Sequence, residues 1–269
     1  MDNDVKIRFT KLKMNLKLYG KAAVAFSGGL SSAFLLRTAQ SVLGTGNVLA
    51  ISVLSKAAPE EERLRSQAMI KEWNIKQVFV ESDFWKDTIK YNGDRTRECR
   101  RELFEKVLKT AREWGYDLVL DGGTVDDPDG SLQIDESSTM LVKPLAQAGL
   151  TKQNLRDIMK NEGWIIYDIQ HNNSLVSRFC HGRNITEIDL EKVDRAENLM
   201  RNLGFSHVRV RDHGDIARVE IDPEEWERFN DTKLRELIYL GLKKLGYAYS
   251  VLDMKGYRPG SMDETQVNR

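Results

Sequence analysis

The chain has 269 residues, 41% of them hydrophobic and 30% charged, so a large core can form beneath a well-solvated surface. Its 41 basic residues balance its 41 acidic ones, which leaves no overall field to attract nucleic acid or an anionic membrane. No stretch approaches the ~20 apolar residues of a membrane span, and residues 1–20 lack the apolar segment of a signal peptide. Cys99 and Cys180 are too few for a disulfide framework, so we expect reduced thiols in a cytoplasmic protein.

The first half of the chain alternates short apolar runs with helical patterns. Residues 22–26 form a continuous apolar run that stops at a Ser-Gly-Gly turn, which predicts a buried strand. Further strands are predicted at 48–54, 77–81 and 117–120, and helices at 32–42, 59–73 and 101–114. Repeated strand–helix units favour an α/β fold with a parallel sheet and helices on both faces. Ligands bind at the carboxyl ends of such strands, so the turns after Phe26, Leu54 and Leu120 are expected at one edge.

A different pattern begins near residue 186. An amphipathic helix is predicted at 187–203, two alternating strands at 207–211 and 216–221, and a last strand at 248–252. Asp222-Pro223 predicts the start of a helix that runs to about residue 245. The order predicts a small α+β domain with its tail at 186–269, after a larger α/β domain at 1–185.

The turn after the first strand has the composition of an anion cradle. Glycines let successive backbone N–H groups face one oxyanion, the following helix adds its partial positive charge, and serine hydroxyls add donors. The residues concerned are Ser27, Gly28, Gly29, Ser31 and Ser32. The loop has no lysine, so it is not a Walker A site. The alternative is a simple strand-to-helix turn with a serine cap.

This loop resembles that of the N-type ATP pyrophosphatases, or PP-loop family, which activate carboxyl, amide or carbonyl groups as adenylates and release pyrophosphate. Their motif is Ser-Gly-Gly-x-Asp-Ser, and Ser31 stands at the Asp position. In that family the acidic residue is thought to help position Mg²⁺ and the triphosphate. Its replacement is expected to weaken metal-assisted chemistry, whereas nucleotide binding by backbone amides can survive.

Colinear segments from about residue 20 to about residue 264 resemble one subfamily, the LarE family. Its members are ATP-dependent sacrificial sulfur transferases that help make the nickel-pincer nucleotide cofactor. Residues 121–127 are similar to its Asp-Gly-(Thr/Ser)-Asn-x-Asp-Asp segment, and residues 143–152 contain a match to its Pro-Leu-x-x-Ala-Gly-Leu-x-Lys segment. Residues 177–186 follow its Ser-Arg-x-x-Tyr-Gly-x-x-Ile-Thr run, and 208–218 and 252–261 match its C-terminal signatures. The number of motifs in order makes the resemblance specific for ancestry.

The resemblance implies an ATP site and a second anion site. The loop residues would hold the ATP phosphates, and Ser55, Gly122 and Thr124 would meet the adenosine. Asp126 would help to hold Mg²⁺, or it would simply cap a turn. The family's substrate is an anionic pyridinium mononucleotide with carboxylate groups, whose phosphate would meet four residues: Ser177, Arg178, Arg209 and Arg211. Arg209 and Arg211 alternate with valines and share a strand face, for which the alternative is a solvated face.

The sulfur chemistry departs from the family pattern. In LarE a cysteine just before the Ser-Arg pair gives up its sulfur, or it helps to hold an iron–sulfur cluster. Ser174 stands at that cysteine, and Thr96 replaces the first cysteine of a further Cys-x-x-Cys, which leaves only Cys99. We therefore expect no iron–sulfur cluster and a sulfur source other than residue 174.

Two thiols remain as carriers of a persulfide from an external sulfur donor. Cys99 is expected near a helix start among four arginines, where its pKa would be low. Cys180 lies beside His181, and the alternative for either cysteine is a small core residue. His181 and His213 could act as acid–base groups, but histidines in loops are common and nothing in the sequence distinguishes these two.

We expect an ATP-dependent adenylating enzyme that transfers sulfur to an activated carboxylate of a mononucleotide. One alternative is an amide- or thioamide-forming ligase with another acceptor. Another is a degenerate nucleotide-binding partner without catalysis, which the replacements at residues 31, 96 and 174 favour. LarE-like proteins form rings, so a homo-oligomer is expected by analogy.

Overall fold

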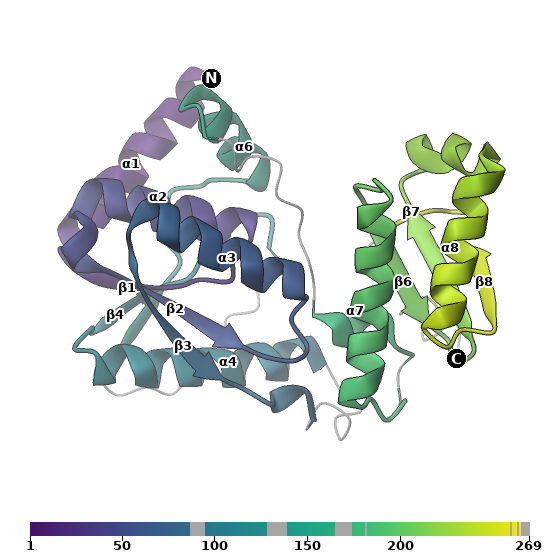
Figure 1. Cartoon of the computed structure of the whole chain (residues 1–269). Helices are drawn as coiled ribbons and strands as arrows, with labels where there is room; N and C mark the ends of the chain where they lie inside the picture. The colour runs from purple at the N-terminus through teal and green to yellow at the C-terminus, as the bar shows by residue number, and fades with distance from the viewer. Residues whose placement is uncertain are drawn as a thin grey trace. The chain divides into compact units, whose positions relative to one another are not determined.

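A computed structural model describes residues 1–86, 95–127, 139–164, 174–180, 182–258, 260–262 and 264. The chain divides into two compact units (Figure 1). Unit 1 comprises Met1–Ser55, Glu62–Phe84 and Gly93–Asn172, and unit 2 comprises Lys56–Glu61, Trp85–Asn92 and Asn173–Arg269. Among the described residues, no helix has both the length and the apolar character that crossing a membrane requires.

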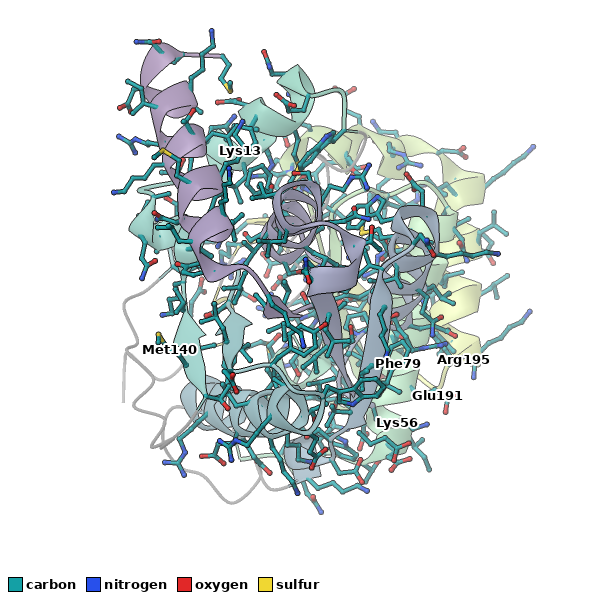
Figure 2. All side chains as sticks on the ribbon, turned by 90° about the vertical axis from the view of Figure 1, so that its left-hand side faces the viewer. Lys13, Lys56, Phe79, Met140, Glu191 and Arg195 are labelled. Carbon is teal, nitrogen blue, oxygen red and sulfur yellow. The ribbon has the colours of Figure 1, made fainter. Side chains whose placement is uncertain are left out.

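Unit 1 is built on a five-stranded parallel sheet in the order β3-β2-β1-β4-β5. The strands are β1 (Ala22–Ala25), β2 (Val48–Leu54), β3 (Lys76–Glu81), β4 (Leu118–Leu120) and β5 (Met140–Val142). The predicted parallel sheet is confirmed. The edge strand β5 was not predicted, because three residues make no recognisable apolar run and Met140 is 63% exposed (Figure 2).

Helices cover both faces of this sheet (Figure 1). They are α1 (Asn3–Tyr19), α2 (Leu30–Leu43), α3 (Glu60–Trp73), α4 (Arg95–Glu113), α5 (Pro144–Gln147) and α6 (Lys152–Asn161). The 3₁₀ turn η1 (Thr45–Asn47) precedes β2, and the 3₁₀ turn η2 (Phe84–Lys86) follows β3, with Trp85 and Lys86 assigned to unit 2. Alternation along β1 divides the core, since Val24 packs with α2 residues such as Phe34, while Ala23 packs with Val107 and Leu108 of α4. The predicted covering of both faces is therefore confirmed.

Two helices of unit 1 differ from the sequence prediction. The helix α1 was not predicted, although Val5, Phe9, Leu12 and Leu16 recur at helical spacing and are all buried. The helix α4 begins at Arg95 rather than at residue 101. Cys99 is therefore in the second turn of α4, where the favourable effect of a helix N-terminus on a thiolate has largely faded. The side chains of Thr96 and Cys99 lie outside the described part.

Unit 2 carries a three-stranded sheet in the order β6-β7-β8, in which β6 is antiparallel and β8 parallel to β7. Its elements are η5 (Leu175–Arg178), α7 (Glu187–Asn202), β6 (Val208–Asp212), β7 (Ile216–Ile221), η6 (Pro223–Asn230), α8 (Thr232–Lys244) and β8 (Tyr249–Leu252). Val208, Val210 and Val219 pack with Met200 of α7 and Leu242 of α8 on one face of the sheet. The predicted α+β order is thus present.

One element of unit 2 was wrongly predicted. The single helix expected from Pro223 to about residue 245 is instead the 3₁₀ helix η6 followed by α8. Asp231 separates them because its backbone is extended, and its carboxylate accepts the N–H groups of Lys233 and Leu234 as the N-cap of α8. Periodicity alone did not reveal this cap inside an otherwise amphipathic stretch.

Candidate functional site

The Ser-Gly-Gly turn connects the end of β1 to the first turn of α2. Ser27 Oγ accepts the N–H of Gly29 at 3.2 Å and lies 3.2 Å from Ser32 Oγ, which also bonds the Gly29 carbonyl. The N-cap of α2 is Gly29, which supplies no side-chain hydrogen bond, so the serine N-cap of the alternative is absent; that the turn binds an anion stays a prediction. An α-helix leaves the N–H groups of its first turn without an intrahelical acceptor, and here they include those of Leu30 and Ser31. This geometry suits an anion.

Two glycines allow the backbone to approach closely at this turn. Gly28 has φ +81°, and a Cβ there would lie 2.8 Å from the Cβ of Ser66 on α3. Arg65 of the same helix donates from Nε to the Gly28 carbonyl at 3.1 Å. A Cβ on Gly122, after β4, would lie 3.0 Å from the backbone nitrogen of Ser32. The cradle is therefore held between α3 and the β4 turn, and sequence reasoning did not single out Arg65 or Ser66.

The other predicted ATP contacts follow strands that neighbour β1. β2 and β4 both pair with β1 in parallel, so their carboxyl ends share its edge and carry Ser55 and Gly122 there. Ser52 Oγ of β2 donates to the Phe26 carbonyl at 2.6 Å and ties two strand ends together. The predicted clustering of these turns at one edge is confirmed.

The turn after β4 is ordered by carboxylates. Thr124 donates from its N–H and hydroxyl to Asp127 Oδ2 at 2.8 and 2.9 Å, and Lys152 Nζ lies 2.7 Å from Asp127 Oδ1. Burial by itself raises the pKa of Asp127, but the bonds from Lys152 and Thr124 outweigh it and lower that pKa. Asp127 and Lys152 end the two family-like segments at 121–127 and 143–152, but the sequence assigned neither residue a role.

Asp126 has a structural partner in this turn. Its carboxylate accepts the N–H of Lys152, the first residue of α6, as a capping group would. Across the described ranges, no group of three or more His, Cys, Asp or Glu side chains is placed to hold a metal ion. A role for Asp126 toward Mg²⁺ stays a prediction.

The arginines predicted for the second anion site come together in unit 2. Arg178 is completely buried and forms a two-point ion pair with Glu197 of α7, with bonds of 2.8 and 3.2 Å. Its Nη1 donates to the Ser177 hydroxyl at 2.8 Å. Burial raises the pKa of Glu197, yet the charges of Arg178, Arg209 and Arg201 together with the Arg178 hydrogen bond lower it to about 2. Arg178 thus links Glu197 of α7 to Ser177 of η5 inside the cluster.

Arg209 and Arg211 lie on the face of β6 opposite the apolar core. They are 4% and 5% exposed, so the alternative of a solvated strand face is wrong. Arg211 pairs with Glu220 of β7 at 2.9 Å and donates to the Ser177 carbonyl at 3.1 Å. Burial and the nearby charge of Arg178 lower the pKa of Arg209. A bound anion would relieve that repulsion.

Sequence reasoning missed the buried carboxylates of this cluster. Glu197 is completely buried, and it falls within the apolar stripe of α7 that contains Leu190, Val193 and Met200. A charged residue inside such a stripe was the available signal. Glu220 is also completely buried, and it pairs in register with Arg209 across β6 and β7. It gave no comparable signal, because a polar residue on one strand face is ordinary.

The candidates for sulfur chemistry have different surroundings. Ser174 is exposed, and its hydroxyl caps η5 by accepting the N–H of Val176 at 3.4 Å. Cys180 is half-buried, with Sγ 3.4 Å from Nδ1 of His213, so it is not a core residue. His181 lies outside the described residues. The structure therefore gives Cys180 an imidazole partner that sequence reasoning did not assign to it.

Known proteins similar to this chain include one with a named activity. The pyridinium-3,5-bisthiocarboxylic acid mononucleotide synthase of Lactiplantibacillus plantarum is 31% identical over 260 residues, which is 93% of this chain and 91% of that protein. An uncharacterised protein of Synechocystis sp. is 31% identical over 90% of this chain and 92% of its own length. Another uncharacterised protein, from Methanocaldococcus jannaschii, is 27% identical over 93% of this chain and 97% of its own length. No protein-family model matches the chain.

Proposed function

Because this chain belongs to the family of the pyridinium-3,5-bisthiocarboxylic acid mononucleotide synthase, the LarE family, we propose that it transfers sulfur to a carboxylate of a mononucleotide after activating that carboxylate with ATP. The supporting likeness extends over nearly the whole of both chains. Adenylation makes the carboxylate a target for a sulfur nucleophile, with AMP as the leaving group.

The β1–α2 cradle supports the ATP-binding part of the proposal. Its donors are main-chain N–H groups and the hydroxyls of Ser27 and Ser32, and the close approach at Gly28 and Gly122 leaves no room for a Cβ. Such donors hold phosphate without a lysine. Ser31 replaces the family's acidic residue in this loop, and its hydroxyl remains a donor.

Mg²⁺ fits the turn after β4 only together with the nucleotide. Mg²⁺ usually binds through one or two carboxylates plus the substrate's phosphates, and Asp126 is the carboxylate we assign to it. When bound, the ion would supply neutralising charge at the triphosphate. The chain's own contribution would be to hold the carboxylate through the N–H of Lys152.

The arginine cluster of unit 2 supports an anionic mononucleotide as substrate. Arg209 and Arg211 present guanidinium groups that match phosphate in two-point contacts, with Ser177 beside them. Glu220 holds the guanidinium group of Arg211 by an ion pair, and the charge of Glu197 favours the charged form of Arg209. Guanidinium groups that are already held in place reduce the ordering that binding would otherwise require.

Ser174, which stands at the family's cysteine position, favours an external source of sulfur. A serine hydroxyl holds no sulfur to donate, so the sulfur is supplied by an external donor and carried by Cys99 or Cys180. Intact-mass measurement after turnover tests this, because a cysteine that sacrificed its sulfur would lose hydrogen sulfide, about 34 Da. A catalytic chain of unchanged mass is the expected result.

Pyrophosphate release tests the activity. The full-length protein with ATP, Mg²⁺ and a pyridinium dicarboxylate mononucleotide should release pyrophosphate, and release should depend on the mononucleotide. Absence of release, with ATP bound normally, would favour the nucleotide-binding partner without catalysis.

The assignment of the arginines has its own test. We expect Arg209→Ala with Arg211→Ala to weaken mononucleotide binding by at least about 100-fold, because each removes a charged hydrogen-bond donor. Arg195→Ala is the matched control, since this residue of α7 is exposed and pairs only weakly with Glu191 at 3.9 Å. Equal affinity of both variants in calorimetry would refute the assignment.

A further inference from the structure

Cys180 and His213 are brought together by a short β-bridge. Phe179 pairs in parallel with Asp212, so the next residue on each side, Cys180 and His213, are neighbours. Their Sγ and Nδ1 atoms lie 3.4 Å apart. Pairing of a cysteine with an imidazole at this range is the arrangement that activates a thiol as a nucleophile.

Asp212 fixes the geometry of the pair. It is completely buried, and its carboxylate is held by Arg183, by the Tyr247 hydroxyl at 2.9 Å and by the N–H of Gly214 at 2.8 Å. Gly214 has φ +81° and turns the chain from β6 to β7 directly after His213. The imidazole therefore projects from a hydrogen-bonded turn, in which the N–H of His213 also donates to the Ile216 carbonyl at 3.0 Å.

The surroundings of His213 favour its neutral imidazole, the form that can accept a proton. Burial lowers the pKa of His213, the Arg218 charge lowers it further, and two carboxylates partly oppose these effects. The charged groups that face it are Arg183, Arg218, Asp212 and Glu220. Arg218 Nε is buried and has no hydrogen-bond acceptor in the described part of the chain, so this face retains an unused donor. A neutral imidazole can take the proton of a neighbouring thiol.

We propose that Cys180 and His213 form a thiol–imidazole pair that accepts a sulfane sulfur atom from an external persulfide. His213 Nδ1 takes the proton of the Cys180 thiol, and the thiolate attacks the outer sulfur of the donor R–S–SH. The S–S bond of the donor breaks as the new S–S bond forms. The donor leaves as R–SH with the proton from His213, and Cys180 becomes a persulfide. One sulfur is oxidised as the other is reduced, so no further oxidant is required.

This inference rests on the proposed function only for the destination of the sulfur. Loading requires neither ATP nor the mononucleotide, so it can be measured in their absence. Cys180 is also half-buried, which leaves it accessible to a small persulfide. A failure of loading with intact pyrophosphate release would overturn only this inference. A failure of pyrophosphate release with intact loading would overturn only the proposed function.

The experiment incubates the full-length protein with glutathione persulfide and maps the added sulfur by intact-mass and peptide mass spectrometry. We expect a gain of one sulfur atom, about 32 Da, on Cys180. His213→Gln should slow loading at pH 7 by about 100-fold, the lower range for general-base catalysis. The difference should close at strongly alkaline pH, where a thiol ionises without the help of a base.

The matched control is His207→Gln. His207 lies in the same unit but pairs with Asp222 instead of a cysteine, so this variant should load as the unaltered protein does. Circular dichroism of both variants shows whether they are folded. Sulfur added to Cys99 instead of Cys180 would overturn the inference. So would equal loading rates for folded His213→Gln and the unaltered protein at every pH.

Discussion

The cradle of unit 1 and the arginine cluster of unit 2, which we propose as anion sites, would hold an anion by different physical means. The cradle uses main-chain N–H groups and serine hydroxyls, and its shape depends on where Gly28 and Gly122 have no Cβ. The cluster uses full charges, with Arg178, Arg209 and Arg211 buried beside carboxylates. The difference teaches that a site made of backbone groups depends on steric fit, whereas a site made of buried charges depends on the pairing of opposite charges. An added side chain should therefore disrupt the first, and the removal of one charge should disrupt the second.

The largest expected effect is the loss of charge balance in unit 2. Glu197→Gln leaves the buried guanidinium of Arg178 without its counter-charge, and we expect a loss of about 3–5 kcal/mol in the free energy of unfolding. Glu191→Gln on the same helix is the control, because Glu191 and Arg195 are exposed (Figure 2). It should change stability by less than about 0.5 kcal/mol. Urea unfolding of both variants measures the contrast, and similar losses would contradict it.

Acid should remove the same contribution. The pKa of Glu197 is lowered from 4.5 to about 2 by folding, so its stabilisation is complete above about pH 4.5 and lost as the pH falls to about 2. By proton linkage this amounts to about 3 kcal/mol. The stability difference between the unaltered protein and Glu197→Gln should therefore shrink over that interval. Unfolding curves that keep a constant difference from pH 5 to pH 2 would show that the pair is not ionised in the way described.

The smallest expected effect on stability belongs to the cradle. Gly28→Ala meets both an unfavourable positive φ and the side chain of Ser66, and we expect a cost of about 1–3 kcal/mol. Because the loop must shift, ATP binding should weaken at least about 10-fold. Gly44→Ala is matched in φ at +83° but has nothing within 4 Å of the added Cβ. In that control, thermal unfolding should show a loss of stability from backbone strain, and calorimetry should show unchanged ATP binding. Normal ATP binding by Gly28→Ala would contradict the steric account.

The sequence by itself determined the parallel α/β sheet, the edge at which its polar turns gather and the order of the small domain. Buried strands and glycine turns are local patterns, so residues 22–32 were sufficient to predict the cradle. The short strand β5 and the Asp231 cap were not predicted, because three residues or one carboxylate leave little periodic signal.

Only the tertiary structure decided the electrostatic partners. Arg211 meets Glu220 diagonally, since the register of β6 and β7 pairs Glu220 with Arg209, two residues before Arg211 on the same strand face. Arg178 meets Glu197 across nineteen positions of sequence. Cys180 and His213 are thirty-three positions apart and become neighbours through one β-bridge. Charge and proton affinity depend on distance and burial, and neither is set until the chain has folded.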